Sequence, residues 1–272
     1  MHGQERIAIS TAVYPSTATF EQVVDAAGQL GVNGIEFLVG GERSLDVLKQ
    51  GEKLRRLMSL KSIRFASVHF PFRIYGKQLD FLNELLFDFN YFSQLFEEVC
   101  SFAKIVNSKI VVVHAGGELV PAGVTCGEAH DLLAKYLNKP AEKARENGLT
   151  LALENSDNRP LRLCKTPEEL LHVARKCKIG VCLDFNHALV CNIKPETMIR
   201  KLDEYIVNTH FSGVDKKQHV AITDKQPWNL YLNLLGKIGY NGLIVLEGGK
   251  AETVDAATKN LIKQIGYLRT LF

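Results

Sequence analysis

The sequence predicts an α/β fold, a closed (β/α)8 barrel, and three observations support this prediction. The chain has 272 residues, near the usual length of such barrels, and 46% of them are hydrophobic, enough for a large core. Short apolar runs alternate with longer segments that have the pattern of helices. The runs are continuous in Val, Ile and Leu, which is typical of parallel strands covered on both faces.

The alternation occurs eight times, and each apolar run is expected to form one barrel strand. The runs are Arg6 to Ser10, Gly34 to Leu38, Phe65 to His69, Ile110 to His114, Leu149 to Glu154, Ile179 to Asp184, Ile206 to His210 and Leu243 to Glu247. Eight prolines and 21 glycines are scattered without a linker-like stretch. Residues 1–272 are therefore expected to form a single TIM-barrel domain.

The segments between the runs carry helix signals. Thr19 and Gln22 have the spacing of a capping box, and Gly31 is expected to end the helix that they begin. Thr166 precedes a proline at the first helical position, which the fixed φ of proline favours. A helix around Leu85 to Ala103 is expected to be the longest of the chain.

An open doubly wound sheet would show the same alternation of strands and helices. Such sheets often carry a glycine-rich phosphate-binding loop after the first strand. In this chain Ser10-Thr-Ala-Val-Tyr-Pro15 follows the first apolar run, so the closed barrel is the better prediction.

The composition narrows the classes of function. The formal charge of +3 is spread along the sequence, unlike the clustered basic stripe of a dedicated nucleic-acid-binding protein. No apolar run reaches membrane-spanning length, and the N-terminal segment lacks the apolar core of a signal peptide. Six cysteines form no Cys-x-x-Cys pair. We therefore expect a cytoplasmic protein without a membrane partner.

Ionisable residues stand near the ends of most predicted strands. The carboxyl ends of barrel strands form the active-site face, so these residues are candidate ligands or catalysts. They are Glu36, His69, His114, Glu154, Asp184, His210 and Glu247, with His187 three residues after Asp184.

The last four strands end in Glu154, Asp184, His210 and Glu247, and this set predicts a metal site. Several carboxylates buried near one another are unfavourable unless a cation compensates their charge. An oxygen-rich set with a single nitrogen favours Mn²⁺, Mg²⁺ or Co²⁺. Zn²⁺ remains an alternative, especially if further histidines join the site.

The remaining residues that stand out in the sequence have structural as well as functional interpretations. His69 and His114 fit a ligand or substrate contact as well as a structural hydrogen bond near the barrel mouth. Glu36 is expected to support another residue or to join a salt bridge. Cys182 and Trp228 are expected to fill the core.

Several motifs resemble the xylose-isomerase-like TIM barrels. They are Leu151-Ala-Leu-Glu-Asn155, Gly180-Val-Cys-Leu-Asp-Phe-Asn-His187 and Gly239-Tyr-Asn-Gly-Leu-Ile-Val-Leu-Glu247, with Ser67-Val-His-Phe-Pro-Phe72 and Val111-Val-Val-His-Ala-Gly116 on strands three and four. This superfamily includes sugar isomerases and epimerases, hydroxypyruvate isomerase, inosose and dehydroshikimate dehydratases, and endonuclease IV.

The resemblance to the ketose-epimerase branch implies a divalent-metal-dependent enzyme that acts on a sugar, a sugar phosphate or a related ketone. It assigns the metal ligands to Glu154, Asp184, His210 and Glu247. Glu154 would remove a proton from the carbon next to a carbonyl, and Glu247 would return one from the other side. The expected substrate-binding residues are His69, His114, His187 and Lys216.

The same positions resemble endonuclease IV, a zinc-dependent phosphodiesterase of abasic DNA, and a nucleic acid is a partner only under this alternative. Its additional zinc ligands correspond in part to His69, His114, His187 and His219. Its third zinc normally takes an Asp-x-His pair where this chain has Lys217-Gln218-His219, and Asp215 has a different spacing.

Two further alternatives stay open. One is an inosose- or dehydroshikimate-type dehydratase, which also begins with proton abstraction beside a carbonyl. The other is a barrel that binds ligand without turnover. The chain lacks the Gly-Glu-Gly that often follows strand seven in related barrels, so the resemblance assigns no substrate. The resemblance does not determine the oligomeric state, and a homo-oligomer is one alternative.

Overall fold

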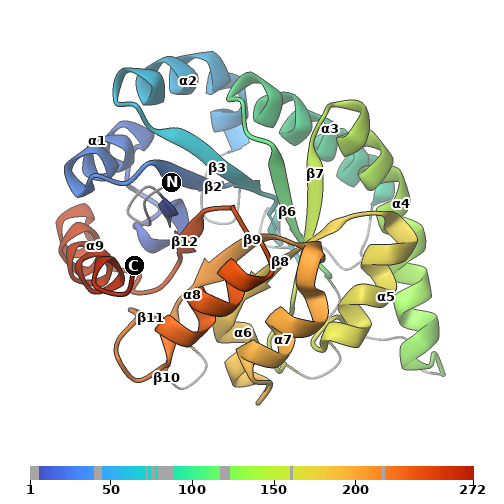
Figure 1. Ribbon diagram of the computed structural model, residues 1–272. Coiled ribbons are helices and arrows are strands. Elements are labelled where there is room, and N and C mark those ends of the chain that lie inside the picture. Colours follow the sequence, from blue (N-terminus) through green and yellow to red (C-terminus); the bar gives the residue numbers. More distant parts are fainter. Residues whose placement is uncertain are drawn as a thin grey trace.

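The fold is a closed barrel of eight parallel strands, in the order β1, β2, β3, β6, β7, β8, β9 and β12. The structure is a computed structural model that describes residues 6–39, 45–71, 73–74, 77–78, 88–116, 123–159, 162–215 and 218–272. Helices surround the strands as an outer ring (Figure 1). The predicted (β/α)8 TIM barrel is confirmed.

The barrel strands coincide with the predicted apolar runs to within one or two residues. They are β1 (Ile7–Ser10), β2 (Gly34–Leu38), β3 (Arg64–His69), β6 (Ile110–His114), β7 (Thr150–Glu154), β8 (Gly180–Asp184), β9 (Ile206–Phe211) and β12 (Ile244–Leu246). These strands are buried along almost their whole length, which explains why the runs show no alternation of polar and apolar residues.

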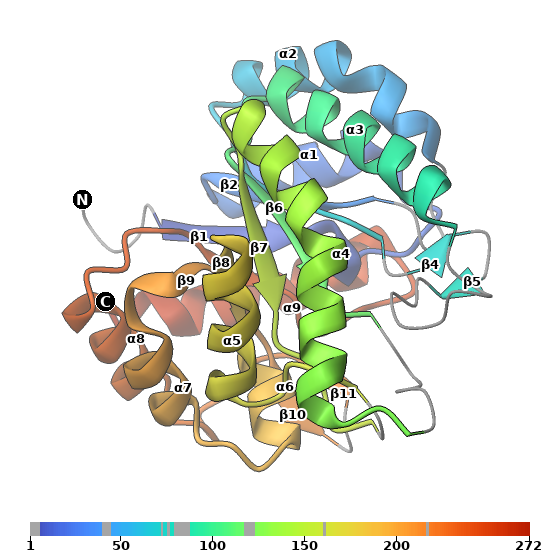
Figure 2. The same ribbon diagram turned by 90° about the vertical axis from the view of Figure 1, so that its right-hand side faces the viewer.

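Two short antiparallel hairpins follow the carboxyl ends of β3 and β9. They are β4 (Arg73–Ile74) with β5 (Lys77–Gln78), and β10 (Gly213–Asp215) with β11 (Gln218–Val220). Figure 2 shows the β4–β5 hairpin projecting beyond the ring of helices. Because both hairpins follow strand ends, they belong to the same rim as the predicted site.

Nine α-helices are described, and most show the predicted end signals. They are α1 (Phe20–Leu30), α2 (Gly51–Leu60), α3 (Phe89–Ile105), α4 (Cys126–Glu146), α5 (Pro167–Cys177), α6 (Phe185–Val190), α7 (Pro195–Leu202), α8 (Trp228–Lys237) and α9 (Val254–Arg269). Thr19 and Gln22 form the capping box of α1, and Gly31 ends this helix with φ of 62°. Thr166 caps α5 ahead of Pro167. Short 3-10 turns lie at η2 (Thr11–Val13), η3 (Leu45–Gln50) and η4 (Asp203–Tyr205).

The prediction that the helix after the third strand is the longest is wrong. Helix α3 has 17 residues, whereas α4 has 21. Helix α4 continues through Pro140, although proline in a helix interior removes a main-chain hydrogen bond and usually ends the helix. The proline therefore conceals the length of α4 in the sequence.

The apolar core lies between the strands and the surrounding helices. Trp228 at the start of α8 is fully buried, and its ring centroid lies 5.3 Å from that of Phe211 and 5.9 Å from that of Phe185. Its Nε1–H donates to the carbonyl oxygen of Thr223 at 2.7 Å. Cys182 is also fully buried, but in a separate small cluster with Val112 and Ala152. Both residues fill the core, as their positions in apolar segments predict.

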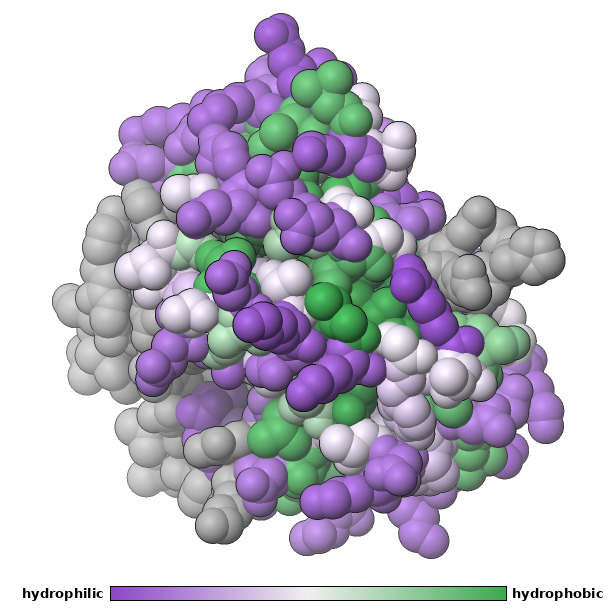
Figure 3. Space-filling model, turned by 90° about the vertical axis from the view of Figure 1, so that its left-hand side faces the viewer, coloured by the Kyte–Doolittle hydropathy of each residue, from purple (hydrophilic) through white to green (hydrophobic). Residues whose placement is uncertain are grey.

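The molecular face that carries α1 and α9 is mixed in polarity. Hydrophilic side chains cover most of it, and patches of hydrophobic residues lie among them (Figure 3). Ile262 of α9 is 57% exposed. Single exposed apolar side chains are normal on protein surfaces and define no interface by themselves. Among the helices that the structure describes, none combines the length and the apolar character needed to cross a membrane.

Candidate metal centre at the barrel mouth

The ends of the last four barrel strands converge on one point. Glu154, Asp184, His210 and Glu247 each offer a ligand atom, and these atoms lie within 4.8 Å of one another. Nδ1 of His210 lies 2.8 Å from Oε1 of Glu154, 2.9 Å from Oε2 of Glu247 and 3.9 Å from Oδ2 of Asp184. The structure thus brings together all four residues that the sequence suggests as metal ligands.

Oδ2 of Asp184 is buried without a hydrogen-bond donor among the described residues, and buried Oε2 of Glu247 shares the single Nδ1 of His210 with Oε1 of Glu154. Such an oxygen loses its hydration without compensation, which is unfavourable. A divalent cation would compensate both oxygens at once. Three carboxylates with one imidazole nitrogen also form the hard, oxygen-rich donor set that Mn²⁺, Mg²⁺ and Co²⁺ prefer. The residues present therefore fit a divalent metal ion.

The Asp184 side chain is held in place by its neighbours. Its main-chain N–H donates to Oδ1 of Asn155 at 2.7 Å, and Nδ2 of Asn155 donates to the carbonyl oxygen of Asp184 at 2.9 Å. Asp184 also caps α6, because its Oδ1 accepts the main-chain N–H of His187 at 2.8 Å. These contacts occupy Oδ1 and leave Oδ2 directed at the cluster.

The carboxylates and His210 shift one another's proton affinity. Burial lowers the pKa of His210, but the carboxylates around it, including Glu247 and Glu36, raise that pKa well above its ordinary value. Burial raises the pKa of Glu247, yet His210 lowers it to about 2. Burial also raises the pKa of Glu154, but His114 and His210 outweigh this effect and hold that pKa well below its usual range. Without metal, both glutamates are therefore ionised beside a protonated His210.

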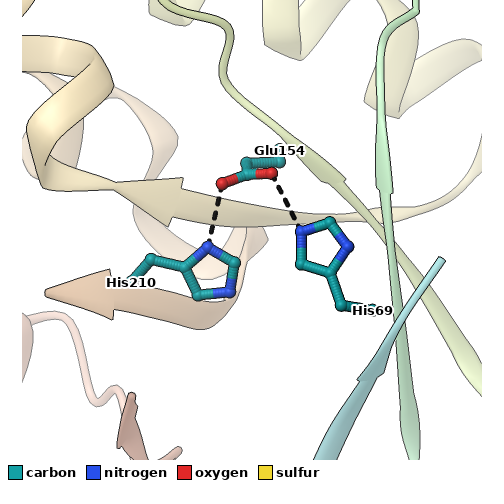
Figure 4. Close-up of side chains that lie close together, drawn as sticks. All are labelled: His69, Glu154 and His210. Carbon is teal, nitrogen blue, oxygen red and sulfur yellow. Dashed lines mark hydrogen bonds and ion pairs between the residues drawn. The ribbon is translucent and has the colours of Figure 1, made fainter. Parts of the chain in front are cut away.

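Two further histidines contact the second oxygen of Glu154. Nε2 of His69 lies 3.2 Å from Oε2 of Glu154, and Nδ1 of His114 lies 3.1 Å from the same oxygen. Figure 4 shows Glu154 between His69 and His210. Burial lowers the pKa of His114 to about 3, whereas hydrogen bonding to Glu154 outweighs burial and raises the pKa of His69 to about 9. Glu154 thus accepts from imidazoles on both sides.

His187 and His219 form a pair next to Asp184. Nδ1 of His187 donates to the carbonyl oxygen of Asn155 at 2.7 Å, and the Nε2 atoms of the two histidines lie 3.2 Å apart. Nε2 of His219 lies 3.9 Å from Oδ2 of Asp184. The His219 side chain is 28% exposed, so this pair forms the outer edge of the cluster. Lys216, the fourth predicted substrate contact, lies outside the described residues.

Two buried polar residues belong to the same region and are not anticipated from the sequence. Ser67 and Asn208 lie two positions before His69 and His210, so each faces the barrel interior like the histidine that follows it. Both contact Glu36, which is completely buried. The alternation of side chains along a strand indicates the face on which they lie, whereas their contact with Glu36 depends on closure of the barrel.

The fold and the residues at the barrel mouth can be compared with those of known protein families. The profile of the xylose isomerase-like TIM barrels matches residues 24–271. The chain belongs to this family. An uncharacterized protein of Methanocaldococcus jannaschii is 27% identical over 179 residues, which cover 62% of this chain. The match spans 65% of that relative, less than two thirds of its length.

Solved structures share the architecture at low sequence identity. A D-tagatose 3-epimerase-like protein has a TM-score of 0.78 at 21% identity, covering 97% of this chain and 98% of its own. D-psicose 3-epimerase of Clostridium cellulolyticum H10, determined with D-tagatose, has a TM-score of 0.80 at 14% identity, covering 98% and 99%. A family 2 AP endonuclease of Brucella melitensis has a TM-score of 0.75 at 14% identity, covering 92% and 96%. These likenesses show the shared fold.

Proposed function

We propose that this protein is a divalent-metal-dependent isomerase or epimerase that moves a proton next to the carbonyl of a sugar, a sugar phosphate or a related ketone. One observation carries the proposal: three carboxylates and one imidazole converge at the barrel mouth, and buried Oδ2 of Asp184 accepts no hydrogen bond from the described residues. Epimerases of D-tagatose and D-psicose type among the structures of the same fold support it.

The metal would be held by Glu154, Asp184, His210 and Glu247. When bound, a divalent cation supplies a fixed positive charge beside the substrate oxygens, and this makes the neighbouring carbon more acidic. Mn²⁺, Mg²⁺ and Co²⁺ fit the donor set best, with Zn²⁺ as the alternative.

The two glutamates would carry the proton transfer. Glu154 is ionised and deeply buried, so it can accept the proton from the substrate carbon. Glu247 would return a proton to the same carbon from the other side and must first take one up. Its side chain is 13% exposed, which allows exchange with solvent. The proton lost at one face is thereby replaced at the other.

The histidines would bind and orient the substrate. His69 and His114 contact Glu154 from β3 and β6, while His187 lies beside Asp184 on α6. Their ring nitrogens offer donors and acceptors to the hydroxyl groups of a carbohydrate. We expect Lys216 to add a contact to an anionic group of the substrate. The partner is thus a small molecule.

Solvent exchange tests this reaction directly. Metal-loaded protein is incubated in D₂O with a panel of ketoses, their phosphates and polyol-derived ketones, and the products are examined by NMR. We expect deuterium at the carbon next to the carbonyl, with formation of the epimer or isomer, and loss of both after chelation of the metal. Elimination of water during exchange would instead identify the dehydratase alternative.

An endonuclease IV-like activity is the second candidate, because extra histidines surround the cluster. Oε2 of Glu154 contacts both His69 and His114, and His187 lies 3.2 Å from His219. Cleavage of a duplex with an abasic site by zinc-loaded protein, with binding that weakens steeply as salt rises, would support it. If the protein shows neither cleavage of this duplex nor proton exchange on the panel, the result favours a barrel that only binds ligand.

A further inference from the structure

Glu36 lies one layer deeper in the barrel than the metal centre. Oε2 of this carboxylate accepts hydrogen bonds from Oγ of Ser67 at 2.5 Å and from Nδ2 of Asn208 at 3.1 Å, and it lies 3.0 Å from Nε2 of His210. The strand register supports this layer, because Glu36 is paired with Ser67 between β2 and β3. All four side chains are at most 2% exposed.

His210 is the charge partner of this buried carboxylate. Among the residues that the structure describes, only His210 provides a basic nitrogen within 4.0 Å of Glu36. A completely buried carboxylate is unfavourable without such a partner, so the position of Glu36 is tied to that of the imidazole. Ser67 and Asn208 fix the carboxylate from the other strands.

The two nitrogens of His210 therefore face different groups. Nε2 faces Glu36, while Nδ1 faces Glu154 and Glu247. A carboxylate accepts and does not donate, so Nε2 carries an N–H toward Glu36, and Nδ1 is the nitrogen that faces the mouth. A carboxylate on the far nitrogen also makes an imidazole a stronger metal ligand.

We propose that Glu36 is a positioning residue of the metal centre, which fixes His210 through its Nε2–H, directs Nδ1 to the metal ion and increases metal affinity. This inference rests on the proposed metal-dependent function. Glu36 itself touches neither substrate nor metal in this role. Ser67 supports it by holding the carboxylate.

The test compares metal affinity in three variants with that of the wild type. Glu36→Gln keeps the shape and an acceptor but removes the charge, and Ser67→Ala removes one hydrogen bond to Glu36. Ser10→Ala is the matched control, because Ser10 is fully buried and pairs with Glu36 between β1 and β2, yet its hydroxyl accepts from the main-chain N–H of Ala12. Affinity for Zn²⁺ and Mn²⁺ is measured by competition with a fluorescent chelator.

We expect Glu36→Gln to bind metal about 10- to 100-fold more weakly, as is usual when such a supporting partner is removed. Ser67→Ala should show a smaller loss and Ser10→Ala no loss. In zinc-loaded wild type with ¹⁵N-labelled histidine, NMR should show His210 bound through Nδ1 and protonated on Nε2. If Glu36 only filled space, it would not determine which nitrogen of His210 carries the proton.

Three results would overturn the inference. One is wild-type affinity in folded Glu36→Gln, and another is His210 bound to Zn²⁺ through Nε2. If Glu36→Gln does not fold, unchanged affinity in Ser67→Ala together with an unprotonated Nε2 in the wild type decides against it. A wild type that binds no metal would overturn the metal centre itself, whereas metal binding that is insensitive to these changes would overturn only the role of Glu36.

Discussion

Nε2 of His210 lies 3.0 Å from Oε2 of Glu36, so a fully buried carboxylate inside the barrel contacts the imidazole that reaches the mouth. The opposite nitrogen of the ring lies within 2.9 Å of carboxylate oxygens of Glu154 and Glu247. Without metal, His210 is therefore flanked by anions on both sides and keeps a proton on each nitrogen. A metal ion at the mouth must replace the proton on Nδ1.

Metal binding should therefore release a proton and strengthen as the pH rises. The carboxylates raise the pKa of His210 well above its ordinary value, so the imidazolium predominates at neutral pH and competes with the metal until the pH passes that pKa. Calorimetric titrations with Mn²⁺ in buffers of different ionisation enthalpy measure the released protons. Equal affinity at pH 6 and pH 8, without proton release, would contradict this interpretation.

Removal of either glutamate should abolish turnover. In Glu154→Gln or Glu247→Gln the base or the donor is lost, and a positioned acid or base is typically worth about 10²- to 10⁴-fold in rate. The rate of deuterium incorporation and the metal content are measured on the same samples. Glu252→Gln changes an exposed glutamate and should behave as the wild type. Full turnover in either site variant would rule out the proton-transfer roles.

Gly248 should be needed for the position of Glu247. A Cβ atom at Gly248 would lie 2.0 Å from the carbonyl oxygen of Val220 and 2.8 Å from Cβ of Ser212. Gly248→Ala must therefore displace main chain next to a predicted ligand, and we expect weaker metal binding and lower activity.

Gly236→Ala is the control for this substitution. Apart from its own helix and chain neighbours, no atom of the described residues lies within 4 Å of a Cβ at this position in α8, so the change should leave metal binding intact and stabilise the fold by about 0.5–1 kcal/mol. Chemical denaturation and metal titration of both variants check the pair. Unchanged metal affinity in Gly248→Ala would show that the Val220 contact is easily relieved.

Trp228 should contribute much of the stability of the core around α8. It is fully buried against Phe185 and Phe211, and replacement of such a side chain by alanine usually costs about 3–5 kcal/mol. Leu60→Ala, at a residue that is 83% exposed, should change the free energy of unfolding by less than about 0.5 kcal/mol. Urea denaturation compares the two, and equal losses would contradict the assigned packing.

The eight strands could be predicted because each is buried on both faces and therefore appears as a continuous apolar run. The four candidate ligands could be predicted for a related reason: each interrupts the apolar pattern where its run ends, at the rim where parallel strands meet. Glu154 and Asp184 are placed at that rim by the register of β6 to β9.

Other parts of the site depend on geometry that the local sequence does not encode. A single polar residue within an apolar strand, such as Ser67 or Asn208, looks like a core residue until the barrel closes and brings it to Glu36. The contact between His187 and His219 spans 32 positions and requires the β10–β11 hairpin to fold back over α6. The conformation of such a connection is set by tertiary packing.

Measured metal content decides whether the four residues at the barrel mouth bind a divalent cation. After equilibrium dialysis against Mn²⁺, elemental analysis of the wild type should find tightly bound metal that chelators remove. Asp184→Asn, which removes the charge but keeps an oxygen to cap α6, should lose most of this metal, whereas Asp255→Asn at an exposed position should retain it. A wild type without bound metal, or equal metal content in Asp184→Asn, would show that these residues form no metal site.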